Sequence, residues 1–251
     1  MLWHKVWCES RTRFLLTAVT LSLLCTGAVL FEPYIQQRGL PIPLHVRQGV
    51  HSEYIYNLIF SGTAKGLFAM LVIFLGLGGL QRERAHNTAV FTLALPVSRH
   101  RLIGMQILVG LLELAALSLL PPVLVPALSA LTHHSYPISA ALHFSALWFF
   151  GGLVIFAVSF LLSVSARGEY TAAVACYVIL MVHTVIAAWH PLAPYRLNVM
   201  WIMGEFRTMY WDTAQNLLLP PPLSWLRMSV LALIAFLLFS ASVRITQRQD
   251  F

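Results

Sequence analysis

Two ionisable side chains, Lys65 and Glu113, fall inside long apolar stretches of the sequence, where a charge is costly and usually functional. At 1.5 Å per residue, Lys65 lies about 10 Å from the start of its stretch and Glu113 about 17 Å from the start of the next. If these stretches are consecutive antiparallel spans, the two depths differ by about 5–6 Å, and a buried ion pair is feasible. Alternatively, Lys65 extends alone towards the membrane surface and Glu113 forms a hydrogen bond within the bundle.

The ten histidines raise the question of a metal or a haem. His143 and His183 are expected near the same end of two spans, a placement that a bis-histidine haem could use, but a second pair is missing. His133 and His134 are adjacent in a turn, with no third ligand at metal-binding spacing. We therefore predict no metal site and no cofactor in this chain.

The sequence lacks the motifs of enzymes that act in or at membranes. A phosphate-binding loop, G-x-x-x-x-G-K-[ST], is absent, and the stretch Gly62–Gly66 has the wrong spacing. Neither the serine hydrolase motif G-x-S-x-G nor the zinc protease motif H-E-x-x-H occurs. We therefore expect no catalytic site and no ATP hydrolysis by this chain.

The composition is that of an integral membrane protein. Hydrophobic residues make up 59% of the 251 residues and charged residues 10%, with a mean hydropathy of +0.76, whereas soluble domains contain about 25% charged residues. The net charge of +7 comes from basic residues at the ends of apolar runs, a pattern that sets the orientation of transmembrane helices in the lipid membrane. The same dispersed pattern does not indicate nucleic-acid binding. Cys8, Cys25 and Cys176 are not placed for a disulfide or a metal site.

Hydropathy predicts a single all-α transmembrane domain over residues 1–251. The six predicted spans are residues 14–31, 58–80, 102–131, 138–164, 170–189 and 223–243. Residues 1–13 are typical of an interfacial helix; the alternative, the start of a signal peptide, is disfavoured because the apolar run that follows exceeds the usual length of about 7–15 residues. Residues 190–222 should lie in the outer interface or dip into it. Pro121, Pro122 and Pro126 should break or kink span three.

The distribution of basic residues predicts the orientation of the spans. With both termini inside, the inner segments hold Lys5, Arg11, Arg13, Arg82, Arg84, Arg99, Arg101, Arg167, Arg244 and Arg248. The outer loops then hold only Arg38, Arg47, Arg196 and Arg207. Because lysine and arginine accumulate on the cytoplasmic side, we predict cytoplasmic N- and C-termini.

The segment between spans two and three combines charge, a short amphipathic piece and a proline turn. Within residues 81–105, Glu83 and Thr88 precede Leu93-Ala94-Leu95-Pro96-Val97-Ser98-Arg99, and Arg101-Leu102-Ile103 follow. This arrangement resembles the type-2 permease subunit of an ATP-binding-cassette (ABC) transporter, in which the pattern is E-x(4)-G-T-x(4)-L-L-x-x-P-[VI]-[ST]-R. Asn87 stands where that family usually has Gly. The alternative is an ordinary inner loop that obeys the charge rule.

The resemblance implies a permease in a bacterial-type cytoplasmic (inner) membrane that exports a substrate through a dimer interface. Its partners would be an ABC ATPase subunit, which binds ATP and magnesium, and a second copy of this chain or a similar permease. Residues 81–101 would form a coupling helix on the ATPase, and spans two and five would line the dimer interface. The coupling residues would be Glu83, Thr88, Phe91, Leu93, Leu95, Pro96, Ser98 and Arg99. A different class, an assembly or electron-transfer subunit of a larger membrane complex, remains the alternative.

Overall fold

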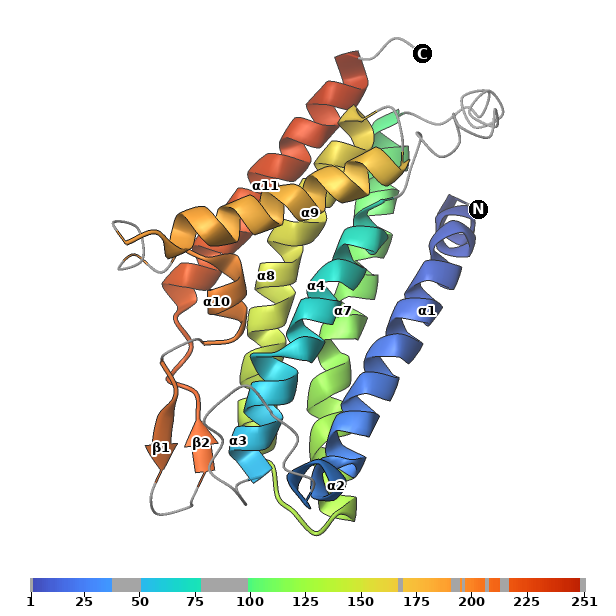
Figure 1. The fold of residues 1–251 in the computed structure, drawn as a ribbon. Coiled ribbons are helices and arrows are strands. Elements are labelled where there is room, and N and C mark those ends of the chain that lie inside the picture. Colours follow the sequence, from blue (N-terminus) through green and yellow to red (C-terminus); the bar gives the residue numbers. More distant parts are fainter. Residues whose placement is uncertain are drawn as a thin grey trace.

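The computed structural model describes residues 2–37, 51–77, 99–166, 169–190, 195, 197–205, 208–212 and 217–248, which are mostly helical (Figure 1). Six helical segments in this part of the chain are long and apolar enough to cross a membrane. They are Trp3–Leu30, His51–Gly76, Arg101–Leu131, Ile138–Ser165, Tyr170–Ala188 and Trp225–Gln247. The prediction of a mostly helical chain with six such segments is confirmed.

The first helix, α1 (Leu2–Leu30), continues through the point where an interfacial helix and span one were expected to meet. The reason is a packing face that continues along its whole length. Val6, Thr17, Leu21 and Cys25 are all buried, at spacings of 11, 4 and 4 residues, which keep them on one side of a helix. A bend after Arg13 would remove the first turns from this face, so one helix covers both predicted pieces. A short helix, α2 (Glu32–Gln37), follows.

The second membrane-length segment consists of three pieces. Helix α3 (His51–Ile55) leads into a π-helical turn, η1 (Tyr56–Phe60), and α4 (Thr63–Gly76) begins after a break at Ser61 and Gly62. At Gly62 a Cβ atom would lie 2.1 Å from the carbonyl oxygen of Asn57, so only glycine fits this break. This span therefore begins earlier than predicted and is interrupted near its middle.

Helix α7 (Arg99–Leu131) is assigned as one helix despite Pro121, Pro122 and Pro126, so the predicted break does not occur. Proline at position 122 removes the N–H group that would bond the carbonyl of Ser118, four residues earlier. The hydroxyl of Ser145 donates a hydrogen bond to that carbonyl at 2.6 Å instead. A neighbouring helix thus satisfies the freed carbonyl, which is how membrane helices tolerate proline.

Helix α8 (Ile138–Ser165) lies at the centre of the bundle and contacts α4, α7, α9 (Glu169–Ala188), α10 (Val199–Met203) and α11 (Trp225–Arg248). Its residue Phe144 stacks on Phe60 of the second span, and the ring of Trp148 contacts that of Phe68 in a tilted arrangement. Helix α9 crosses this bundle obliquely (Figure 1).

A two-stranded antiparallel sheet, β1 (Tyr210–Asp212) and β2 (Leu217–Leu219), precedes α11; Tyr210 pairs with Leu219. The all-α prediction missed this hairpin, because three-residue strands carry almost no periodic signal.

The start of α1 and the end of α11 lie towards the same end of the bundle, called here the terminal end (Figure 1). Helices α2 and α3, the hairpin and the end of α7 lie at the opposite, distal end (Figure 1). This arrangement follows from an even number of long helices that alternate in direction. The interruption of the second span at Ser61 and Gly62 lies between these two ends, near the middle of the bundle.

Candidate functional site

The π-turn and the break after it leave irregular backbone near the middle of a membrane-length segment. The N–H of Ser61 donates to the carbonyl of Tyr56 at 2.8 Å, a five-residue step that closes the π-turn. Such turns within helices are rare and often mark functional sites. Irregular backbone at membrane depth is tolerated where other protein groups cover it, and here the covering element is α10.

Helix α10 is built by a buried capping residue. Asn198 is 1% exposed and its side-chain oxygen accepts hydrogen bonds from the N–H groups of Met200 and Trp201 at 2.9 and 3.3 Å. The helix packs on the middle of α8, because Gly151 lets Met203 approach so closely that a Cβ there would lie 2.3 Å from the methionine Cγ. Gly151 is about 20 Å along α8 from Ile138. Helix α10 therefore lies well away from both ends of the bundle.

Lys65 binds this helix. The lysine is 7% exposed, and its Nζ donates a hydrogen bond to the carbonyl of Met200 at 3.0 Å. A Cβ at Gly204 would lie 2.7 Å from Nζ, so a glycine there leaves room for the amine. On the other side of the break, the Tyr56 hydroxyl donates to the carbonyl of Gly204 at 2.9 Å. Cations and donors are favoured at a helix C-terminus, where carbonyls lack intrahelical partners.

A buried carboxylate follows directly. Glu205 is 4% exposed and has a φ of 45°, a conformation rare for residues other than glycine. Its Oε2 accepts from the Thr208 hydroxyl at 2.6 Å and lies 4.0 Å from Nη1 of Arg227, while its Oε1 lies 3.6 Å from Nε2 of His143. We call Tyr56, Lys65, His143, Glu205 and Arg227 the polar centre.

These neighbours stabilise the ionised form of the Glu205 carboxyl group. Burial by itself would raise the pKa of its carboxyl group. The nearby His143 ring, the hydrogen bond donated by the Thr208 hydroxyl and the charge of Arg227 together outweigh burial and lower the pKa of the carboxyl group below its ordinary value. Glu205 is therefore ionised at neutral pH, within a layer that also holds Lys65 and Arg227.

The two charged residues singled out from the sequence do not contact each other. Lys65 binds the carbonyl of Met200, whereas Glu113 is 2% exposed in α7 and has Ser10 and Arg13 of α1 as its polar neighbours. No ion pair joins Lys65 and Glu113 in the structure. The alternative is therefore wrong for Lys65, which turns inwards to α10 and not to the membrane surface, while the polar neighbours of Glu113 lie within the bundle, as that alternative predicts.

The predicted coupling residues cannot be placed. Glu83, Thr88, Phe91, Leu93, Leu95, Pro96 and Ser98 lie outside the described residues, and Arg99 is described only as the first residue of α7. What the structure adds is the polar centre around Glu205, which the sequence analysis missed. The available signals were weak: a Gly-Glu pair, and an Asn directly before a short apolar run.

The two histidines considered for haem binding have protein partners. His143 lies beside Glu205, and Nε2 of His183 accepts a hydrogen bond from the N–H of Val199 at 3.4 Å. Both help to hold the segment around α10.

A cavity of about 540 Å³ opens between α8, α9, α10 and α11. Its lining is mostly aliphatic, and its charged or ionisable members are Arg227, His183, Tyr195 and Cys176. Because Arg227 also faces Glu205, this cavity adjoins the polar centre. A volume of this size is enough for a small apolar ligand or part of a lipid chain.

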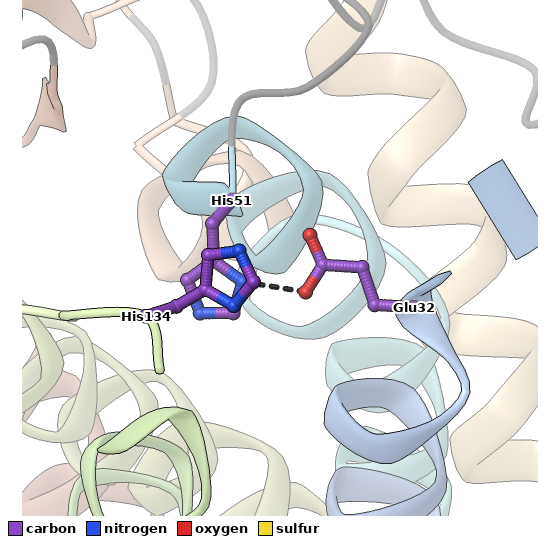
Figure 2. A group of neighbouring side chains, drawn as sticks. All are labelled: Glu32, His51 and His134. Atoms are coloured by element: carbon purple, nitrogen blue, oxygen red, sulfur yellow. Dashed lines mark hydrogen bonds and ion pairs between the residues drawn. The ribbon is translucent and has the colours of Figure 1, made fainter. Parts of the chain in front are cut away.

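A second cluster lies at the distal end (Figure 2). Nδ1 of His51 is 2.5 Å from Oε2 of Glu32, and Nε2 of His51 is 2.9 Å from the hydroxyl of Ser129. The ring of His134 stacks on that of His51 with 4.7 Å between centroids. One ligand atom from each of Glu32, His51 and His134 lies within 4.8 Å of the others, which makes them a candidate metal-binding group.

No family model matches this chain, and no curated protein matches it either.

Proposed function

We propose that this chain is the permease subunit of an ABC-type exporter in a bacterial-type cytoplasmic membrane. Residues 81–101, the coupling segment, would bind a separate ATPase subunit on the cytoplasmic side, where both termini would also lie. The chain itself would hydrolyse no ATP. The sequence pattern from Glu83 to Arg99 supports the assignment of the coupling segment.

The observation that carries the proposal is the position of α4. This helix runs from the polar centre to Gly76, and the described chain resumes at Arg99, the start of α7, at the same terminal end (Figure 1). At 1.5 Å per residue, α4 is about 20 Å long from the break at Gly62 to Gly76, five residues before the coupling segment begins. A displacement of that segment would therefore reach the polar centre through one short, rigid helix.

The hydrogen bonds of the polar centre would pass this movement to α10. Lys65 on α4 binds the carbonyl of Met200, and Tyr56 before the break binds the carbonyl of Gly204. The π-turn and Gly62 separate α4 from α3, so α4 could tilt while α3 stays packed. In this proposal α10 is a re-entrant element, and its shift against α8 would change the adjoining cavity of about 540 Å³.

Two exposed apolar faces suit the dimer that the proposal requires. On α4, Met70 and Phe74 are exposed one turn apart, and Gly66, one turn before them, has open space where a Cβ would be. Helix α9 carries large exposed side chains along most of its length, such as Val174 and Val185. Small residues permit close contact between membrane helices, so we place the interface with the second permease copy along α4 and α9.

The test requires the partner ATPase, which would be sought by isolating the chain from its native membranes and identifying a co-purifying protein with a phosphate-binding loop. Variants Glu83→Ala and Arg99→Ala should insert normally but lose at least 80% of the permease-dependent stimulation of ATP hydrolysis, roughly the effect expected when a charged contact worth about 1.5–3 kcal/mol is removed. Arg244→Ala is the matched control, because it removes a basic charge near the end of α11 and should leave stimulation unchanged.

Normal stimulation by both coupling variants would refute the coupling assignment. Failure to find any ATPase in native membranes, with the chain instead bound to an enzyme complex, would favour the assembly-subunit alternative.

A further inference from the structure

The cluster of Glu32, His51 and His134 at the distal end takes no part in the proposed coupling of α4 to α10. Glu32 opens α2, His51 opens α3, and His134 lies in the turn between α7 and α8, so three segments that are distant in sequence meet here (Figure 2). Glu32 and His51 are buried, at 4% and 7% exposed, while His134 is exposed. The cluster thus has an interior side and a side open to the surroundings.

The end of α7 positions two groups of this cluster, the His134 ring and the Ser129 hydroxyl that contacts His51. His133 has a φ of 60°, a left-handed conformation that ends the helix, and the N–H of His134 then donates to the carbonyl of Ser129 at 2.9 Å. This turn brings His134 back over the last turn of α7. The same turn holds the Ser129 hydroxyl against Nε2 of His51. One helix ending therefore supplies a candidate ligand and fixes the orientation of another.

The donor set fits a borderline transition metal. Two imidazoles and one carboxylate are ligands that Zn²⁺ accepts, with a fourth position left for water or an external ligand. A zinc-binding histidine usually forms a hydrogen bond through its other ring nitrogen, which sets its tautomer and direction. Nε2 of His51 forms such a bond with Ser129, which leaves Nδ1 directed at Glu32.

We propose that Glu32, His51 and His134 bind a zinc ion through Oε2 of the carboxylate, Nδ1 of His51 and one ring nitrogen of His134. With metal–ligand distances of about 2.0–2.1 Å, ligand atoms in a tetrahedral site lie about 3.3 Å apart. In the bound state the neutral His51 ring carries its proton on Nε2, which donates to the Ser129 hydroxyl, so that Nδ1 offers its lone pair to the ion; Nδ1 and Oε2 of Glu32 move apart from 2.5 Å. The exposed ring of His134 closes the remaining gap from within 4.8 Å. The bound ion joins α2, α3 and the turn after α7.

The experiment uses the full chain in detergent, without a polyhistidine tag, treated with a chelator and then titrated with Zn²⁺ by calorimetry. The expected result is one ion per chain with a dissociation constant in the micromolar range or below. His134→Ala and Glu32→Gln should each weaken binding at least tenfold. The matched control is His133→Asn, which removes a neighbouring imidazole but keeps a residue that tolerates the left-handed conformation; its affinity should be that of the unaltered chain.

Thermal unfolding with and without Zn²⁺ supplies a second measurement, because an ion that joins α2, α3 and the turn after α7 should stabilise the folded chain. Zn²⁺ should raise the unfolding midpoint of the unaltered chain and of His133→Asn, and leave that of His134→Ala unchanged. No stoichiometric binding to the unaltered chain, or equal affinity of His134→Ala and the unaltered chain, would overturn the proposal. Both outcomes are independent of ATPase coupling, so they do not bear on the proposed transport function.

Discussion

Replacing Gly62 by alanine should destabilise the protein, and the same change at Gly66 should not. A Cβ at position 62 would lie 2.1 Å from the carbonyl oxygen of Asn57 and 3.2 Å from that of Leu58. A normal contact between carbon and oxygen is about 3.3 Å or longer, so main-chain atoms would have to move by about 1 Å. Overpacking of this kind costs about 1–3 kcal/mol, and backbone atoms have less freedom to move than side chains, which favours the upper part of that range.

Gly66 is the matched control, because it lies four residues further along and a Cβ there would meet nothing within 4 Å. Glycine within a helix is about 0.5–1 kcal/mol less stable than alanine, so Gly66→Ala should be neutral or slightly stabilising. The two variants should therefore differ by about 2–4 kcal/mol. For a chain of this size that difference corresponds to roughly 4–16 °C in the unfolding midpoint.

A thiol-reactive fluorescent dye can follow this unfolding in detergent. Cys25 and Cys176 are at most 1% exposed and should react only when the bundle opens. Cys8 is half-buried and would react earlier, so the measurement is made in a Cys8→Ser background. Equal midpoints for Gly62→Ala and Gly66→Ala would show that the second span is continuous at this position. The proposed tilt of α4 relative to α3 would then be refuted as well.

Two further predictions concern the buried charges. In a double-mutant cycle of Lys65→Ala and Glu113→Ala, the effects on stability should add within about 0.5 kcal/mol, because each residue has separate polar neighbours; a coupling energy above about 1 kcal/mol would show that they interact. The lowered pKa of Glu205 stabilises the fold above the ordinary value of 4.5, and this contribution is lost as the pH falls below 4.5 through the folded-state value. Glu205→Gln should remove that part of the acid sensitivity while His143 and Arg227 remain. Thermal unfolding midpoints of the variant and the unaltered chain, measured from about pH 3 to 7, would test this. Parallel dependence of the two midpoints on pH would contradict the prediction.

The six membrane-length helices could be predicted from the sequence because their signal is local. A run of about 20 apolar residues can satisfy its backbone in lipid only as a helix. The ends of the predicted spans therefore lie close to the observed helix ends for the segments that begin at Arg99, Ile138 and Glu169. The interruption at Gly62 escaped prediction, because a glycine in an apolar run is equally consistent with a continuous helix packed closely on a neighbour.

The partners of the buried polar groups were decided by tertiary structure alone. The apolar runs show that Lys65 and Glu113 fall within membrane-length segments, but a position in the sequence does not specify which acceptor a cation finds. Lys65 binds a main-chain carbonyl 135 positions away, and main-chain acceptors have no residue-type signal in the sequence. The same holds for the carbonyl of Ser118, which Pro122 leaves without a helical donor, because the hydroxyl that bonds it comes from α8.

The spacing of the histidines in the sequence did not indicate the cluster of Glu32, His51 and His134 for a related reason. His133 and His134 have no third ligand nearby in sequence, whereas folding brings Glu32 and His51 to His134 from separate segments. Sequence thus determined that the chain forms apolar helices with a few costly charges among them, since hydropathy is a property of each segment. Only the packed bundle decided which groups meet, because hydrogen bonds and metal ligands depend on distances between segments and not on their order.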